Sequence, residues 1–272
     1  MPTIGIITCQ ILELEFAHLL AADPEIMSVT VLRDHFSEGV IEALEQKSGS
    51  QLNTILYVGE YAPQSSTEFE VLVRVMELGL HSVIKKLRET VVKAVYEMAQ
   101  HVDAIFLGYG LCGNALEKPD ELFVNAGAPV FLPMETHNHV DDCVGLIIGG
   151  RENYYEEQCK LAGTFFMNSG FTRHWKDLIH KNVCSDEDLA MSKRLMANYE
   201  RSLLLPTPVM SENEMTVNIQ EFNEMYGLRS EVRYGSLDIL EKNWERAKFF
   251  VKFGIDPWLK NGCIFSHQSV HE

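Results

Sequence analysis

Short apolar segments alternate with amphipathic segments along nearly the whole chain. Residues 3–8 (TIGIIT) and 103–107 (DAIFL) are rich in β-branched and other large apolar side chains, as central strands of a parallel sheet are. The strongest helical pattern covers residues 82–98, with Ser82 expected as its N-cap. This alternation predicts an α/β fold of Rossmann-like type, with a mainly parallel sheet and helices on both faces.

The remaining elements follow from the same patterns. Residues 69–78 are expected to form the strand before the long helix, and further strands are expected at residues 27–32, 53–61, 130–134, 164–167, 203–205 and 232–234. Further helices are expected at residues 11–20, 37–46, 119–125, 141–148, 152–161, 171–180, 185–199, 214–225 and 236–250. Residues 1–253 should form a single α/β domain, with two lobes divided near residues 162–185 as the alternative, and residues 254–272 an irregular tail.

Composition and charge narrow the function classes. The chain has 272 residues, 46% of them hydrophobic, and a formal net charge of -16, so most of its surface would repel a nucleic-acid backbone. No long uncharged apolar run is present, and no basic segment of a secretory signal precedes the first strand, so we expect a cytoplasmic protein that does not enter membranes. Its six cysteines should then be reduced, as metal ligands or nucleophiles rather than disulfides.

A glycine-rich turn follows the strand at residues 103–107. The sequence from Ile105 to Asn114 reads IFLGYGLCGN, which places Cys112 among three glycines. Glycine permits positive φ angles and close approach of another group, and backbone N–H groups in such a turn would favour the thiolate of Cys112. Taken alone, this turn is more simply interpreted as a tight connection that buries a small cysteine.

Four metal-ligating residues should meet at one edge of the predicted sheet. Cys9, His81, Cys112 and Cys143 each follow a predicted strand, and the carboxyl ends of parallel strands share one edge. Three of them are cysteines at or near helix N-termini, where thiolates are favoured. Three cysteines and one histidine suit a zinc ion, whereas three cysteines alone suit an iron–sulfur cluster such as [4Fe–4S]. No C-x-x-C pair supports this site, so it depends on the fold.

The same turn also fits a dinucleotide-binding fingerprint. Gly108, Gly110 and Gly113 match G-x-G-x-x-G after a strand. Glu135 follows at a separation along the sequence that suits an acidic residue contacting the ribose. The candidate cofactor-binding residues are then Gly108, Tyr109, Gly110 and Gly113. A short following segment with Pro119, and the position of the motif in mid-chain, favour the metal site over a dinucleotide-dependent oxidoreductase.

Several other polar residues are weaker candidates. Asp141 is expected to cap the helix that begins near Cys143, and His139 with Asp142 could act there as a general base or a further ligand. We interpret the others as loop, packing or surface residues, namely His137, Cys159, Cys184 and the tail residues Cys263, His267 and His271.

The motifs together resemble a known family. GYGLCGN at residues 108–114, LGLH at 78–81, DDC at 141–143 and GTFF at 163–166 resemble the domain of unknown function 1638 family of anaerobic archaea and bacteria. Supporting similarities are TC at residues 8–9, IIGG at 147–150, YERSLLL at 199–205 and YGSLDIL at 234–240. The family usually has a His beside an Asp before the third cysteine, whereas Asp141 precedes Asp142 here and the nearest histidine is His139.

The resemblance implies that Cys9, His81, Cys112 and Cys143 belong to one site. Because family members often occur in settings of one-carbon and corrinoid-dependent methyl metabolism, the resemblance implies a metal-dependent enzyme or accessory factor. Its partners would be a small-molecule substrate and a corrinoid or methyltransferase protein. A non-catalytic carrier of a metal or corrinoid is the alternative: a closed shell of four ligands favours the carrier, and an open coordination position favours the enzyme.

Overall fold

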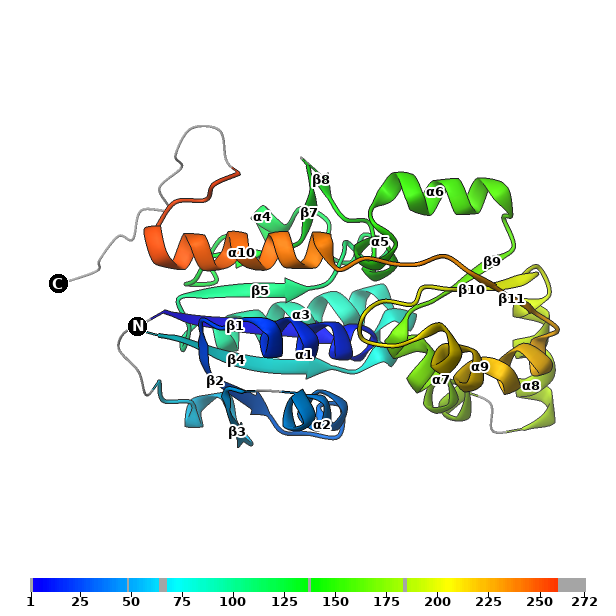
Figure 1. Cartoon of the computed structure of the whole chain (residues 1–272), viewed down its shortest axis with the longest axis horizontal. Coiled ribbons are helices and arrows are strands. Elements are labelled where there is room, and N and C mark those ends of the chain that lie inside the picture. Colours follow the sequence, from blue (N-terminus) through cyan, green and yellow to red (C-terminus); the bar gives the residue numbers. More distant parts are fainter. Residues whose placement is uncertain (1, 48, 64–67, 137, 183–184, 259–272) are drawn as a thin grey trace.

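A six-stranded parallel sheet forms the centre of the protein. The computed structural model describes residues 2–47, 49–63, 68–136, 138–182 and 185–258, so the predictions for His137, Cys184 and the tail after residue 258 lie outside the described residues. The strand order is β3-β2-β4-β1-β5-β6, and every pairing is parallel. Helices alternate with these strands along the chain (Figure 1), which confirms the α/β, Rossmann-like prediction.

The middle strands of this sheet bring three loops to one edge. The strands are β1 (Thr3–Cys9), β2 (Ile26–Leu32), β3 (Gln51–Ile55), β4 (Phe69–Met76), β5 (Ala104–Gly108) and β6 (Val130–Phe131). Thr8 of β1 pairs with Val75 of β4 and with Gly108 of β5. The segments that follow β1, β4 and β5 therefore start side by side, as the carboxyl ends of parallel strands must.

Helices pack on both faces of the sheet. The helices of this part are α1 (Glu13–Ala22), α2 (Glu38–Lys47), α3 (Ile84–Met98), α4 (Pro119–Leu122), α5 (Cys143–Ile148) and α10 (Asp238–Phe253). On one face, Phe106 of β5 contacts the rings of Phe16 of α1 and Trp244 of α10. On the other face, Gly5 of β1 leaves just enough room for Met98 of α3, because a Cβ on Gly5 would lie 2.4 Å from the Met98 sulfur.

Some predicted elements were wrong in their bounds. The strand expected at residues 53–61 is β3 and ends at Ile55, before the 3₁₀ turn η2 (Val58–Glu60). The strand expected at 130–134 ends at Phe131, because the chain turns at Pro133 into the hairpin of β7 (Met134–Glu135) and β8 (Asn138–His139). Ser82 does not cap α3 but belongs to the 3₁₀ turn η3 (Leu78–Ser82).

A second, smaller sheet follows α6 (Arg151–Lys160). Its three parallel strands are β9 (Thr164–Met167), β10 (Arg201–Leu204) and β11 (Arg229–Val232), in the order β11-β10-β9. They pack with α7 (Ser169–Asn182), α8 (Asp186–Met196) and α9 (Glu212–Tyr226) around a core of their own that contains Trp175 and Phe222. Helix α10 then returns to the large sheet (Figure 1). Among the described helices, none has both the length and the apolar character needed to cross a bilayer.

The two sheets are joined near the end of β1. Asn168 donates a hydrogen bond from Nδ2 to the Ile11 carbonyl (2.9 Å), and Ser169 donates from Oγ to Oε1 of Glu15 (2.6 Å). Gly170 packs directly against the Ile11 backbone. Glu15 is fully buried in this joint, and burial raises its pKa from the ordinary 4.5 to about 7, with a smaller contribution from the nearby charge of Glu13.

This buried carboxyl gives a testable dependence of stability on pH. A raised folded-state pKa means that the stabilising contribution of Glu15 is complete below about pH 4.5 and is lost as the pH rises through about 7. Glu15→Gln stays neutral and keeps an oxygen for Ser169, so above pH 7 we expect its free energy of unfolding to exceed the parent's by roughly 2–3 kcal/mol. Urea unfolding at about pH 5 and about pH 8 measures this. Equal stabilities at the higher pH would contradict it.

Candidate metal centre

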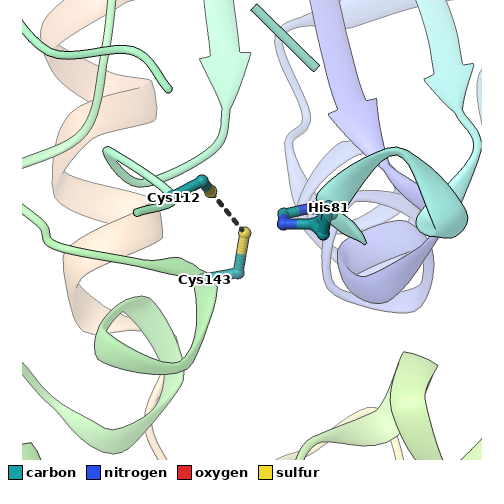
Figure 2. A group of neighbouring side chains, drawn as sticks. All are labelled: His81, Cys112 and Cys143. Carbon is teal, nitrogen blue, oxygen red and sulfur yellow. Dashed lines mark hydrogen bonds between the residues drawn. The ribbon is translucent and has the colours of Figure 1, made fainter. Parts of the chain in front are cut away.

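Three side chains from three different loops meet at the carboxyl edge of the large sheet. His81 lies in η3 after β4, Cys112 in the turn after β5, and Cys143 is the first residue of α5. One ligand atom from each lies within 4.8 Å of the other two, and the sulfurs of Cys112 and Cys143 are 3.8 Å apart. Figure 2 shows the three side chains pointing toward one another. This group could hold a metal ion.

Backbone hydrogen bonds hold the two cysteine loops together. Leu111 donates from its N–H to the carbonyl of Val140 (2.9 Å), and Cys112 donates to the carbonyl of Asp141 (2.8 Å). Gly110 lies directly against the second loop, because a Cβ on this residue would be 2.4 Å from the Asp142 Cα. The glycine is therefore required by the close approach of the two backbones. This contact fixes the spacing between the two sulfurs.

The backbone of Cys112 has an unusual conformation. Its φ angle is +48°, and Gly113 and Asn114 also have positive φ angles of +64° and +67°. A left-handed conformation at a residue with a Cβ costs roughly 1–2 kcal/mol, and such strain concentrates at functional sites. Arg88 of α3 supports the turn, donating from Nε to the Ala115 carbonyl (2.7 Å) and from a terminal nitrogen to the Asn114 carbonyl (2.9 Å).

Asp142 caps the helix that carries Cys143. Its Oδ1 accepts a hydrogen bond from the Gly145 N–H (2.9 Å), and its backbone is extended, as an N-cap residue requires. The prediction that Asp141 is the cap was wrong, and that residue forms an ion pair with Arg151 instead (3.1 Å). Burial raises the pKa of Asp142. Its capping bond explains its position, and the predicted catalytic role stays a prediction.

In the absence of a metal, the surroundings of His81 and Cys112 favour their neutral forms. The pKa of His81 is lowered by burial, which favours the neutral imidazole that binds metals. The pKa of Cys112 is raised, first by its hydrogen bond with Cys143 and then by burial. Metal binding at this site would therefore release protons.

One buried nitrogen of the group has no hydrogen-bond partner within the part of the chain that the structure describes. Nε2 of His81 is enclosed, yet no described residue forms a hydrogen bond with it. Leaving a buried polar atom unpaired costs roughly 1–3 kcal/mol, so the site is incomplete as protein alone. A neutral imidazole and two adjacent thiols are also the donor types that zinc prefers. The residues present therefore fit a metal ion.

Tyr109 is a neighbour that the sequence patterns assigned only to cofactor binding. Its ring stacks on His81 with centroids 6.1 Å apart, and it is fully buried. Its hydroxyl has no hydrogen-bond partner among the described residues. Burial raises the pKa of Tyr109, and the charges of Cys9, Cys143 and Cys112 raise it further. The unsatisfied hydroxyl, like Arg88, could not be inferred from a motif, because its contact depends on the three-dimensional path of the chain.

Cys9 lies outside the group of three. It is the last residue of β1 and is fully buried, and its pKa is raised by burial and by the charge of Cys143. It is therefore close enough to interact with the site electrostatically, but its sulfur is not among the ligand atoms that all lie within 4.8 Å of one another. A role for Cys9 as a metal ligand stays a prediction.

The glycine-rich turn is not followed by the helix that a dinucleotide-binding motif requires. The chain after Gly113 makes turns, and the next helix is α4, with only four residues. A Cβ on Gly108 would lie 2.3 Å from the Phe16 ring, so the chain itself fills the space beside this glycine. Glu135 accepts the Arg151 N–H at the start of α6 (2.9 Å). These contacts do not support dinucleotide binding at this turn.

His139 is not part of the three-residue group either. It lies in β8, where Nδ1 is buried and has no hydrogen-bond partner among the described residues. Burial lowers its pKa, and the charged residues that influence it are Asp120 and Arg246 rather than the thiols. Its predicted part as a general base beside Cys143 gains no support from this position. Cys159 is exposed on α6, as expected of a surface thiol.

Comparison with known proteins identifies one family. No curated protein and no solved structure matches the chain. A family model described as protein of unknown function (DUF1638) matches residues 75–244, which is more than half of the 272 residues. The matched segment includes His81, Cys112 and Cys143, whereas Cys9 precedes it. The chain therefore belongs to the DUF1638 family.

Proposed function

We propose that the protein is a zinc-dependent enzyme in which His81, Cys112 and Cys143 are the metal ligands. The observation that carries this proposal is the half-buried imidazole of His81, which lies beside two thiols and whose buried Nε2 has no hydrogen-bond partner among the described residues. A bond to a metal would satisfy a group that the described residues leave without a partner.

The spacing of the sulfurs favours a single metal ion over a cluster. Two thiolates bound to one tetrahedral zinc at about 2.3 Å each are about 3.8 Å apart. The sulfurs of Cys112 and Cys143 are separated by this distance. In a [4Fe–4S] cluster each iron takes its own thiolate, and the ligands are normally four cysteines. The group contains only two, so zinc is the better proposal.

The number of ligands favours catalysis over metal storage. Structural zinc sites have four protein ligands, whereas catalytic sites have three and keep one position for water or substrate. Two cysteines and one histidine are one of the known catalytic sets. Zinc bound there would supply a Lewis acid that stabilises the deprotonated form of a ligand in the open position.

The substrate that we propose is a small thiol that accepts a methyl group. This reaction rests on the one-carbon and corrinoid-linked setting that the family resemblance implies. The bound thiol would lose its proton to solvent, and its sulfur would attack the methyl carbon of a methylated corrinoid on a partner protein. The cobalt–carbon bond would break with its electron pair left on cobalt. The hydroxyl of Tyr109 has no hydrogen-bond partner among the described residues, and we assign to it a hydrogen bond to sulfur in this site.

Cobalt substitution tests the open position. We expect protein purified without oxygen to bind one zinc per chain, and the Co²⁺ form to show thiolate-to-cobalt charge-transfer absorption. Adding ethanethiol should strengthen this absorption, because a further thiolate joins the metal, whereas ethanol should not. An unchanged spectrum would favour the closed shell of a carrier. Broad visible absorption of the protein as purified, together with iron, would show a cluster instead.

His81→Ala tests the histidine ligand. We expect metal affinity to fall by more than the roughly 10–100-fold typical of losing an outer-shell partner, because a direct bond is removed. The metal-free variant should unfold within about 1 kcal/mol of the parent, since the lost imidazole leaves no hydrogen bond broken at Nε2. Competition with a chelator and thermal unfolding give the two values. His101→Ala, at another half-buried histidine, is the control, and unchanged zinc affinity in His81→Ala would exclude this ligand.

A further inference from the structure

A separate cavity of about 230 Å³ lies at the same edge of the large sheet. Its walls come from the segments after β1, β2 and β4 and from α7, so it lies where the second sheet's helix meets the first sheet. Such junctions, at the carboxyl ends of parallel strands, are the usual places for ligands in α/β proteins. The polar residues that line it are Gln10, His35, Glu77, His174 and Asp177.

The charges of this cavity select against anions. Glu77 and Asp177 contribute carboxylates to the wall, and no lysine or arginine is among its described lining residues. The whole chain also carries a formal charge of -16. A phosphate or carboxylate would be repelled here, whereas a cation would be attracted.

His174 is oriented by a buried acid. Its Nε2 lies 2.6 Å from Oε1 of Glu13, a residue at the start of α1 that is fully buried. Arg173 also approaches that carboxylate, at 3.7 Å, and it is not among the residues that line the cavity. A carboxylate accepts hydrogen bonds, so Nε2 donates to Glu13, and in the tautomer that this bond selects Nδ1 is the acceptor. A base held by a buried carboxylate is a recurring arrangement in binding and catalytic sites.

The acceptor nitrogen of His174 has a carboxylate beside it. Nδ1 lies 3.8 Å from Oδ2 of Asp177, which is too long for a direct hydrogen bond. An ammonium group has several N–H donors and one positive charge, so it can donate to both acceptors at once. The lining residues Phe36, Leu78 and Leu178 add apolar surface for a short hydrocarbon chain.

We propose that this cavity is a second ligand site, and that it binds a small molecule with an ammonium group between His174 and Asp177. The site does not depend on the proposed metal, because none of His81, Cys112 and Cys143 lines it. The two sites share the turn η3, since Leu78 and Gly79 form part of the cavity wall and His81 follows them in the same turn. Gln10 links this turn to the end of β1 by accepting the Leu78 N–H (3.1 Å).

Titration with butylammonium tests the site, with butanol and butyrate as neutral and anionic probes of similar size. Nitrogen-15 NMR of the histidine rings follows His174 in the whole protein. We expect saturable binding of butylammonium that shifts the Nδ1 resonance of His174, and at least roughly tenfold weaker binding of the other two probes. The metal-free and zinc-loaded forms should behave alike, which separates this result from the outcome for the metal site.

Asp177→Asn is the matching variant, because this exposed side chain can lose its charge without disturbing the core. We expect it to weaken butylammonium binding by about three- to fivefold, the size of a solvent-exposed ion pair. Glu187→Gln removes an exposed charge on α8 as the control and should leave binding unchanged. Equal binding of butanol, an unshifted His174 resonance, or an unaffected Asp177→Asn variant would each overturn the proposal.

Discussion

Cys143→Ser is expected to abolish stoichiometric zinc binding. The variant replaces one of two thiolates with a hydroxyl that remains protonated, and only His81 and Cys112 remain of the three grouped donors. Zinc binds thiolate far more strongly than a neutral hydroxyl, so we expect at least a roughly thousandfold loss of affinity, or about 4 kcal/mol. Metal analysis after dialysis against a weak chelator, followed by competition titration, measures the loss.

Two further cysteine variants make this result interpretable. Cys159→Ser removes an exposed thiol on α6 and should bind one zinc per chain like the parent. Cys9→Ser removes the buried thiol next to the site, and with Cys9 outside the group of three we expect much of the zinc affinity to remain. If Cys9→Ser loses zinc as completely as Cys143→Ser, the site has three thiolate ligands. Full zinc retention in Cys143→Ser would exclude the proposed centre.

The fold could be predicted because the sequence patterns of its strands and helices are local and recur along the chain. Strands buried on both faces, such as β1, consist of continuous apolar residues, and that pattern does not depend on distant contacts. The alternation with helices then leaves a parallel sheet as the main solution. The meeting of His81, Cys112 and Cys143 follows from this topology, because each residue lies beyond the end of its strand.

The position of Cys9 relative to the site could not be predicted, because it depends on where β1 ends. Cys9 still pairs with Met76 as part of the sheet, so the pleat of the strand fixes the direction of its side chain. Cys112 and Cys143 lie past their strands, in loops that can turn toward each other. A difference of one or two residues in a strand end therefore decides which thiols meet, and such ends are poorly determined by sequence patterns.

The residue that caps α5 also could not be predicted from the sequence. Asp141 and Asp142 are both good N-cap residues, and their order in the sequence does not say which one caps α5. The choice follows from the pairing of the loop with residues 111–112, which commits the Asp141 carbonyl to Cys112 and leaves Asp142 to accept the Gly145 N–H. Contacts between segments that are distant in sequence settled this detail, and the sequence patterns contain no signal for them.

Gly110→Val should disrupt the centre from a position that touches no ligand directly. A Cβ at this residue would lie 2.4 Å from the Asp142 Cα and 2.6 Å from its carbonyl carbon and nitrogen, so the two loops must separate. That movement breaks the hydrogen bonds from Leu111 and Cys112 to the second loop. Because Cys143 follows Asp142 directly, its sulfur would move away from that of Cys112, and we expect loss of zinc together with about 4 kcal/mol or more of folding free energy.

Measuring both zinc affinity and the free energy of unfolding shows whether Gly110→Val damages the metal site or the protein core. Gly49→Val is the matched control, because a Cβ at Gly49 meets no atom within 4 Å, and its stability should stay within about 0.5 kcal/mol of the parent. Zinc titration and urea unfolding of the two variants, each with and without metal, separate damage to the site from damage to the core. A Gly110→Val protein that binds one zinc with parental affinity would show that the separation of these two loops does not control the metal centre.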